Sequence, residues 1–176
     1  GGLPELGNLN KPVICAVNGI CCGGGLEIAL SCDLIICSDN ATFALPEIRS
    51  GTVADAASIK LPKRIPYHVA MDLLLTGRWF DADEAKSYGL IKEIVKSDQL
   101  RKKAWELAEL LAGGPPLVYA AIKEIVRDAE DLKFQDALNR ITKRQFKTVD
   151  QLYSSEDQIE GAKAFAEKRT PKWKGK

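Results

Sequence analysis

The sequence predicts an α/β fold, and three features of its patterning favour that class. Short apolar, β-branched runs of strand length occur at residues 13–17, 34–37, 42–44 and 91–95. Short helical runs and turn residues separate these strands, and longer segments with helical apolar spacing follow residue 100. The chain has 176 residues, enough for one domain with its own core.

The helices can be placed in order from their caps and apolar spacing. Gly77 and Gly89 are expected to end two short helices, and Ser155 with Gln158 forms a helix-start signature. We therefore expect an α/β core over residues 1–112 and a helical region over residues 113–176. The predicted helices are 26–30, 69–75, one opened by 81–84, 100–111, 117–129, 132–149 and 155–168.

Composition gives no sign of a membrane or nucleic-acid partner. The formal net charge is +1, with 45% hydrophobic and 28% charged residues, which is ordinary for a globular protein. No apolar run approaches the roughly 18–20 residues of a spanning helix, and no signal peptide is visible, so we expect a cytoplasmic location, or mitochondrial or peroxisomal in a eukaryote.

The cysteines indicate buried thiols in a reducing compartment rather than a metal site. Their number is odd, and they occur in apolar runs near the N-terminus. The chain contains no C-x-x-C pair and a single histidine, His68, so we expect no metal. The five are Cys15, Cys21, Cys22, Cys32 and Cys37.

The chain is organised around residues 11–33, which read as strand, glycine-rich turn and helix. Gly23, Gly24 and Gly25 let the backbone approach a ligand, and N–H groups at a helix start suit a phosphate or an oxyanion. The turn is neither a P-loop nor a dinucleotide fingerprint, because Gly-Lys-Ser/Thr is missing and Ile28 replaces the third glycine. A turn that serves only packing is the alternative, but the carboxylate of Glu27 on an apolar helix favours a site.

A second carboxylate, Glu47, follows twenty positions later in the run ALPE. The stretch NGICCGGGLEIALSCDLIICSDNATFALPE resembles the enoyl-CoA hydratase/isomerase (crotonase) family, whose mark is GGG-x-E followed at this spacing by Pro-Glu. The resemblance continues through LTGR at 75–78, AKSYGL at 85–90 and EGAKAFAEKR at 160–169. Within the family, the ALPE run and the ending FAEKRTPKWKGK look most like carnitinyl-CoA dehydratases.

The resemblance implies a fold, an assembly and a ligand. The fold would be a spiral of ββα turns, followed by C-terminal helices that form a trimer or a dimer of trimers. Family members usually have a further N-terminal part that supplies the other oxyanion N–H and much of the CoA surface, and we expect this part of the fold to be absent from the chain. The substrate would be an acyl-CoA thioester, with no cofactor beyond the CoA that the substrate carries.

The resemblance also assigns roles to matching residues. Gly24 would donate its N–H to the thioester oxygen, with Gly23 and Gly25 beside it. Glu27 and Glu47 would share one water and act as acid and base, so that water is added to or removed from the α,β double bond. Both glutamates together favour hydration or dehydration over double-bond isomerisation, which needs one acid/base group.

Two further places carry binding candidates. After Gly51, Ala54 and neighbouring alanine and serine residues replace the proline and glycines usual in family hydratases. Gly51 and Asp55 are candidates for substrate contact, and Ser58 could also reach the acyl chain; alternatively, Asp55 only caps the next helix. Near the C-terminus, Phe165 and Lys168 match family positions that touch CoA. The alternative there is a solvated basic tail.

Two other functions stay open. One is an enoyl-CoA isomerase. The other is a non-catalytic binding or scaffold protein of the same fold, which the altered segment after Gly51 allows. The presence of Glu27 and Glu47, together with the near-neutral charge, argues against a scaffold that binds nucleic acid.

Overall fold

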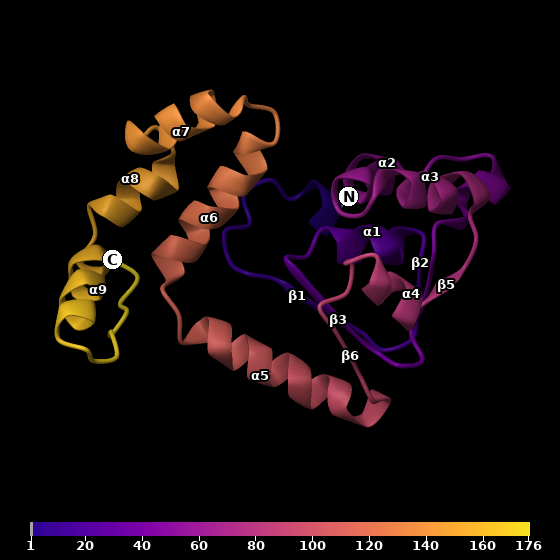
Figure 1. Cartoon of the computed structure of the whole chain (residues 1–176), viewed down its shortest axis with the longest axis horizontal. Coiled ribbons are helices and arrows are strands. Elements are labelled where there is room, and N and C mark those ends of the chain that lie inside the picture. Colours follow the sequence, from indigo (N-terminus) through magenta and orange to yellow (C-terminus); the bar gives the residue numbers. More distant parts are fainter. Residues whose placement is uncertain (1) are drawn as a thin grey trace. The chain divides into compact units, whose positions relative to one another are not determined.

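The computed structural model describes residues 2–176 and divides them into two compact units (Figure 1). The first unit holds the residues up to Leu6 together with Val13–Ala108, and the second holds Gly7–Pro12 and Glu109–Lys176. The division falls inside helix α5 (Leu100–Ala112). Each unit is described by itself, and Gly1 lies outside the described residues.

Two small sheets form the framework of the first unit. In one, the strand order is β1-β3-β6 and all pairs are parallel, with Ile14 opposite Leu34 and Ile36 opposite Glu93. In the other, the order is β2-β4-β5, with β2 and β4 parallel and β5 antiparallel to β4. The strands are β1 (Ile14–Val17), β2 (Ile20–Cys22), β3 (Leu34–Ser38), β4 (Thr42–Ala44), β5 (Phe80–Asp81) and β6 (Glu93–Val95).

The order of these strands along the chain gives the spiral. β1 and β2 precede α1, and β3 and β4 precede α2; within each pair, the first strand joins one sheet and the second joins the other. The α/β fold class and its ββα turns are therefore confirmed. The helices of this unit before α5 are α1 (Gly24–Leu30), α2 (Asp55–Lys60), α3 (Tyr67–Thr76) and α4 (Ala82–Ser87).

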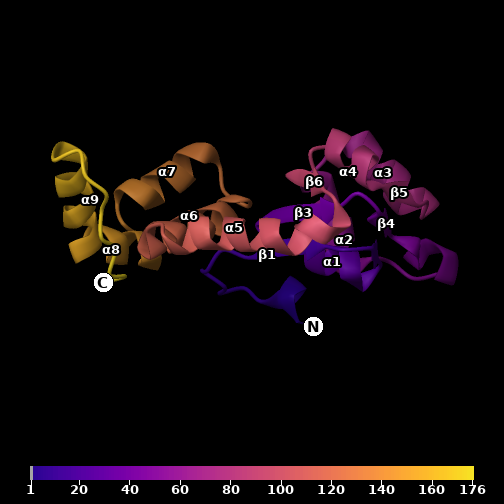
Figure 2. The same cartoon turned by 90° about the horizontal axis from the view of Figure 1, so that it is seen from below.

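The core of the first unit packs α1 and the strands together. Leu26 and Ala29 of α1 are fully buried, and the rings of Phe43 and Phe80 stack with centroids 5.4 Å apart. Helix α1 also lies beside α2 in both views (Figures 1 and 2). This packing holds the glycine-rich turn, which joins β2 to α1, in a fixed place.

Several predicted boundaries differ from the structure. Strands β2 and β5 are not predicted by the sequence, because β2 lies in the stretch read as the glycine-rich turn and the two residues of β5 are too few to show periodicity. Both strands pair with β4. Helix α1 begins at Gly24, two residues before the predicted start at Leu26. The predicted boundaries of the helices at 69–75 and 81–84 lie close to the observed ones. Gly77 is the left-handed C-cap of α3, and the side chain of Asp81 caps the start of α4 by accepting from the N–H of Glu84.

The second unit is helical. Helices α7 and α8 both lie beside α6, and α9 follows α8 (Figures 1 and 2). Phe146 and Val149 are buried with Ala121 of α6. The helices after α5 are α6 (Pro116–Ala129), α7 (Phe134–Thr142), α8 (Lys147–Tyr153) and α9 (Glu156–Ala166).

The prediction of one helix over 132–149 is wrong. Arg144 adopts a left-handed conformation with φ of 53°, and the N–H of Gln145 bonds back to the carbonyl of Arg140, which ends α7. The chain turns here so that Phe146 and Val149 reach the core around Ala121. Tertiary burial therefore outweighs a local pattern that is helical throughout.

The C-terminal residues are not a free tail, although the basic side chains there, among them Lys172 and Lys174, are exposed as a solvated charge run would be. Asp157 of α9 is only 3% exposed and accepts the N–H groups of Lys174 at 2.7 Å and Gly175 at 2.8 Å. Glu160 accepts two bonds from the guanidinium of Arg169, at 2.6 and 2.9 Å. The last residues therefore fold back along α9.

The five cysteines are all free thiols. Burial raises the pKa of Cys21 and of Cys37 to about 11, so both remain protonated at neutral pH. Among residues 2–176, none of the helices is long and apolar enough to cross a membrane.

Candidate active site

The site is built on the first turn of α1. Gly23 precedes the helix with φ of 55°, and its carbonyl accepts the N–H groups of Leu26 at 2.9 Å and Glu27 at 3.1 Å. The N–H groups of Gly24 and Gly25 come earlier in the helix, where no intrahelical acceptor exists, and both residues are exposed. These two donors are free to meet an anion or a developing oxyanion.

The side chain of Glu47 approaches this turn from beyond the end of β4, in the β2-β4-β5 sheet. It lies in the 3₁₀ helix Pro46–Ser50, directly after β4. Its Oε1 is 3.0 Å from the point that a Cβ on residue 23 would occupy. Its Oε2 is buried and has no hydrogen-bond partner among residues 2–176. A buried carboxylate oxygen without a partner is costly, so its retention indicates a function.

The backbone places Glu47 there because β2 and β4 pair side by side. The N–H of Gly23 donates to the carbonyl of Ala44 at 3.0 Å, which ties the glycine-rich turn to the end of β4. After Glu47, the N–H and the hydroxyl of Thr52 both donate to its carbonyl at 3.2 Å. The two segments that carry GGG-x-E and Pro-Glu are therefore joined directly.

Glu27 has a structural contact that its sequence position does not reveal. Its Oε1 accepts the N–H of Ala57 in the first turn of α2 at 3.0 Å. The N-cap residue of that helix is Ala54, whose side chain cannot accept a hydrogen bond. Glu27 therefore caps α2 from α1, and the alternative that Asp55 caps this helix is wrong.

A pocket of about 320 Å³ adjoins Glu47. One wall comes from the segment after Glu47 and the other from α3, and most of the lining is apolar. The lining residues are Leu45, Glu47, Ile48, Thr52, Val53, Ala54, Ser58, Met71, Leu74 and Leu75. Its size and character suit a short acyl chain.

The remaining predicted residues lie in different surroundings. Gly51 and Asp55 are not among the described residues that line the pocket, whereas their neighbours Thr52 and Ser58 are. Sequence reasoning also missed Met71 and Leu75 of α3, because apolar residues at helical spacing look the same whether they face a core or a pocket.

Phe165 and Lys168 belong to the second unit. Phe165 is 88% exposed on α9, and Lys168 follows that helix in a left-handed conformation with φ of 52°. Both residues therefore lie at the surface, and their contact with CoA stays a prediction of the resemblance.

Comparison with known proteins identifies the family. The family described as enoyl-CoA hydratase/isomerase matches residues 2–176. Carnitinyl-CoA dehydratase of Proteus mirabilis (strain HI4320) is 46% identical over 99% of this chain and 67% of its own length. Carnitinyl-CoA dehydratase of Escherichia coli (strain K12) is 44% identical over the same shares. The chain thus spans about two thirds of the length of these curated relatives.

Solved structures of enoyl-CoA hydratases share the fold of this chain. Enoyl-CoA hydratase from Bacillus anthracis superposes with a TM-score of 0.89 at 34% identity, covering 99% of this chain and 66% of that one. Enoyl-CoA hydratase from Mycobacterium tuberculosis H37Rv gives a TM-score of 0.88 at 35% identity, covering 98% and 67%. The sequence match, the fold and the joined GGG-x-E and Pro-Glu segments together place this chain in the enoyl-CoA hydratase/isomerase family.

Proposed function

We propose that this chain carries the acid/base groups and one oxyanion donor of a hydro-lyase that adds water to, or removes it from, an enoyl-CoA thioester. The observation that carries the proposal is the buried, unpartnered Oε2 of Glu47 next to the first turn of α1. A carboxylate oxygen in that state is available to a water or a substrate hydroxyl.

Different groups would act on the thioester oxygen and on the carbons of the double bond. The N–H of Gly24, at the start of α1, would stabilise the thioester oxygen as it becomes enolate-like, an effect worth about 3 kcal/mol of barrier per donor. In hydration the water oxygen bonds the β-carbon and the α-carbon gains a proton: Glu47 would give that proton to the α-carbon, and Glu27 would take one from the water, with the same transfers reversed in dehydration. Glu27 would hold that water with the oxygen that Ala57 does not occupy.

The finer proposal is a carnitinyl-CoA dehydratase. The identity of 44–46% with relatives of that name supports it, and so does the ALPE run around Glu47. The pocket beside Glu47 is lined mainly by aliphatic side chains, with the hydroxyls of Thr52 and Ser58 as polar groups. These features favour a short acyl chain, with the hydroxyls as contacts for its polar substituent.

The test compares crotonyl-CoA with crotonobetainyl-CoA and follows the enoyl absorbance. We expect turnover that Glu47→Gln lowers about 10²–10⁴-fold, and a preference for crotonobetainyl-CoA. Preference for crotonyl-CoA would contradict the finer proposal only. Full turnover by Glu47→Gln, or double-bond migration without hydration, would contradict the proposed reaction. Because the chain spans about two thirds of the length of its relatives, CoA binding is measured in parallel. If neither substrate is turned over, this measurement shows whether the chain still binds CoA.

A further inference from the structure

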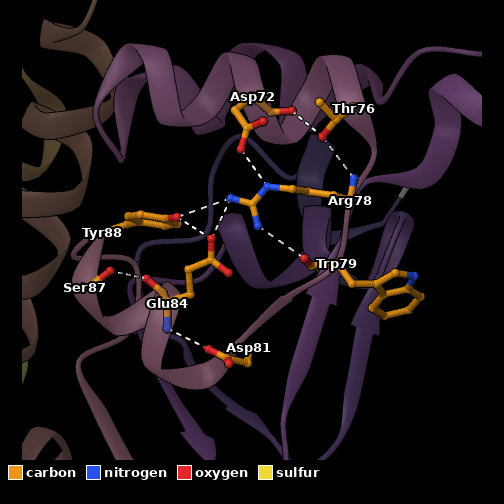
Figure 3. Close-up of polar contacts among 8 residues, drawn as sticks. All are labelled: Asp72, Thr76, Arg78, Trp79, Asp81, Glu84, Ser87 and Tyr88. Atoms are coloured by element: carbon orange, nitrogen blue, oxygen red, sulfur yellow. Dashed lines mark hydrogen bonds and ion pairs between the residues drawn. The ribbon is translucent and has the colours of Figure 1, made fainter.

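Arg78 joins α3 to α4 through a cluster of polar side chains. Its Nε donates to Oδ2 of Asp72 at 2.7 Å, and its Nη2 donates to Oε1 of Glu84 at 2.6 Å and to the hydroxyl of Tyr88 at 3.3 Å (Figure 3). Tyr88 in turn donates to Oε1 of Glu84. The guanidinium is thus bonded to side chains of α3, of α4 and of Tyr88, the residue that ends α4, a geometry that a lysine ammonium cannot reproduce.

The same residues fix the turn that ends α3. The hydroxyl of Thr76 donates to the carbonyl of Asp72 at 2.7 Å and accepts from the N–H of Arg78 at 3.3 Å (Figure 3). The N–H of Gly77 donates to the carbonyl of Leu73 at 3.1 Å. Gly77 is thereby held in a left-handed conformation with φ of 58°.

Gly77 packs directly on the backbone that carries Glu47. A Cβ at residue 77 would lie 2.9 Å from Cγ2 of Ile48, 3.2 Å from the carbonyl oxygen of Leu45 and 3.4 Å from Cα of Pro46. These three residues flank Glu47 on both sides. A side chain at residue 77 would therefore collide with this segment, so the end of α3 lies close against it.

The carboxylate of Glu47 depends on that packing for its direction. Its Oε2 accepts no hydrogen bond within residues 2–176, so no polar contact to that oxygen holds it in place. The 3₁₀ helix Pro46–Ser50 follows the end of β4, which the N–H of Gly23 ties to the glycine-rich turn at Ala44, and Gly77 packs on its other side. We take this backbone position to set where the carboxylate points. If the end of α3 became less tightly held, the carboxylate of Glu47 would therefore lose its fixed direction.

We propose that Arg78 is a positioning residue for Glu47: by locking the end of α3 it holds Gly77 against Leu45 and Pro46 and so keeps the carboxylate aimed at the first turn of α1. This inference rests on the proposed acid/base role of Glu47. Its rival is a purely structural role, in which Arg78 stabilises the fold without affecting Glu47.

The first test observes Glu47 without any substrate. Glutamate carboxyl groups are labelled with ¹³C, and the Glu47 signal is assigned by its loss in Glu47→Gln. We expect Arg78→Gln to shift the Glu47 signal, with a smaller shift in Arg78→Lys. The matched control is Lys96→Gln, which removes an ion pair of 2.8 Å with Asp39 in the same unit. An unmoved Glu47 signal in folded Arg78→Gln overturns the proposal.

The second test is kinetic. At temperatures where every variant is fully folded, we expect Arg78→Gln to lower kcat by about tenfold to a hundredfold, with KM changed less than twofold. An equal loss in Lys96→Gln, or a loss that follows only the unfolded fraction, overturns the proposal. If Arg78→Gln does not fold, Arg78→Lys takes its place, with the same direction of change and a smaller loss of kcat. Gly77→Ala, whose added Cβ would push on Leu45 and Ile48 directly, should then lower kcat as far as is expected of Arg78→Gln.

The two proposals fail separately. Full turnover by Glu47→Gln contradicts the acid/base role of Glu47, whatever Arg78 does. A turnover that needs Glu47 but is unaffected by Arg78→Gln, with the Glu47 signal in place, contradicts the positioning role alone.

Discussion

Glu47 occupies the space beside Gly23 that a side chain would need: Oε1 of the carboxylate lies 3.0 Å from the position of a Cβ on residue 23. The contact joins the two motifs that are twenty residues apart along the chain. Because Gly23 also has φ of 55°, both space and backbone conformation call for glycine there.

Gly23→Ala should therefore lower activity as well as stability. The methyl group would push the Glu47 carboxylate away from the first turn of α1, and the left-handed backbone would cost about 1 kcal/mol or more. We expect kcat for crotonyl-CoA hydration to fall at least tenfold, on the scale of misplaced catalytic groups.

Gly89→Ala is the matched control for that variant. Gly89 has φ of 81°, but a Cβ there would meet nothing within 4 Å. It should lose similar stability in a thermal melt and keep its kcat. Equal kcat losses in the two variants would mean that backbone strain, not contact with Glu47, is responsible.

Glu27 should prove separable into a structural and a chemical role. Glu27→Ala removes the acceptor for the N–H of Ala57 and should destabilise the chain by about 1 kcal/mol, as loss of a helix cap does. Glu27→Gln keeps a carbonyl oxygen for that bond but cannot exchange a proton. It should unfold close to wild type in urea while its turnover is lost; a Gln variant as unstable as the Ala variant would contradict the capping role.

The C-terminal residues should be released by Asp157→Ala. The buried carboxylate of Asp157 accepts two backbone N–H groups, and their loss should cost about 1–3 kcal/mol locally. Hydrogen exchange at Lys174 and Gly175 should become fast. Asp157→Asn, which retains an acceptor oxygen, should give intermediate protection, and unchanged exchange in the Ala variant would contradict the docking of this segment.

The contact between Glu160 and Arg169 should survive mild acid. Hydrogen bonds from Arg169, and then from the N–H of Lys172, lower the pKa of Glu160 from 4.5 to about 2. A depressed folded-state pKa means that the stabilisation is fully present above about pH 4.5 and is lost as pH falls toward 2. Carboxyl NMR should show this midpoint. Arg169→Gln should move it back toward 4.5, and a midpoint near 4.5 in the wild-type chain would contradict the pairing.

The sequence predicted well wherever the signal is local. The left-handed cap at Gly77 and the cap of α9, where Ser155 accepts from Gln158 at 3.1 Å, depend on residues close by in the sequence. The apolar runs at 13–17 and 42–44 also mark the strands β1 and β4 directly. It failed where a partner is distant. Strands β2 and β5 exist only through pairing with β4, and the helix predicted over 132–149 breaks so that Phe146 can be buried.

For the candidate site, the sequence by itself determined the residue types and the family, because GGG-x-E and Pro-Glu are read directly from the chain. Only the tertiary structure decided what these residues touch: Glu47 against Gly23, Glu27 on Ala57, α3 as a pocket wall, and Gly77 against Leu45. The physical reason is that spacing along a chain fixes local backbone geometry. Contacts between segments depend instead on how helices and strands pack, and neither propensity nor periodicity encodes that packing.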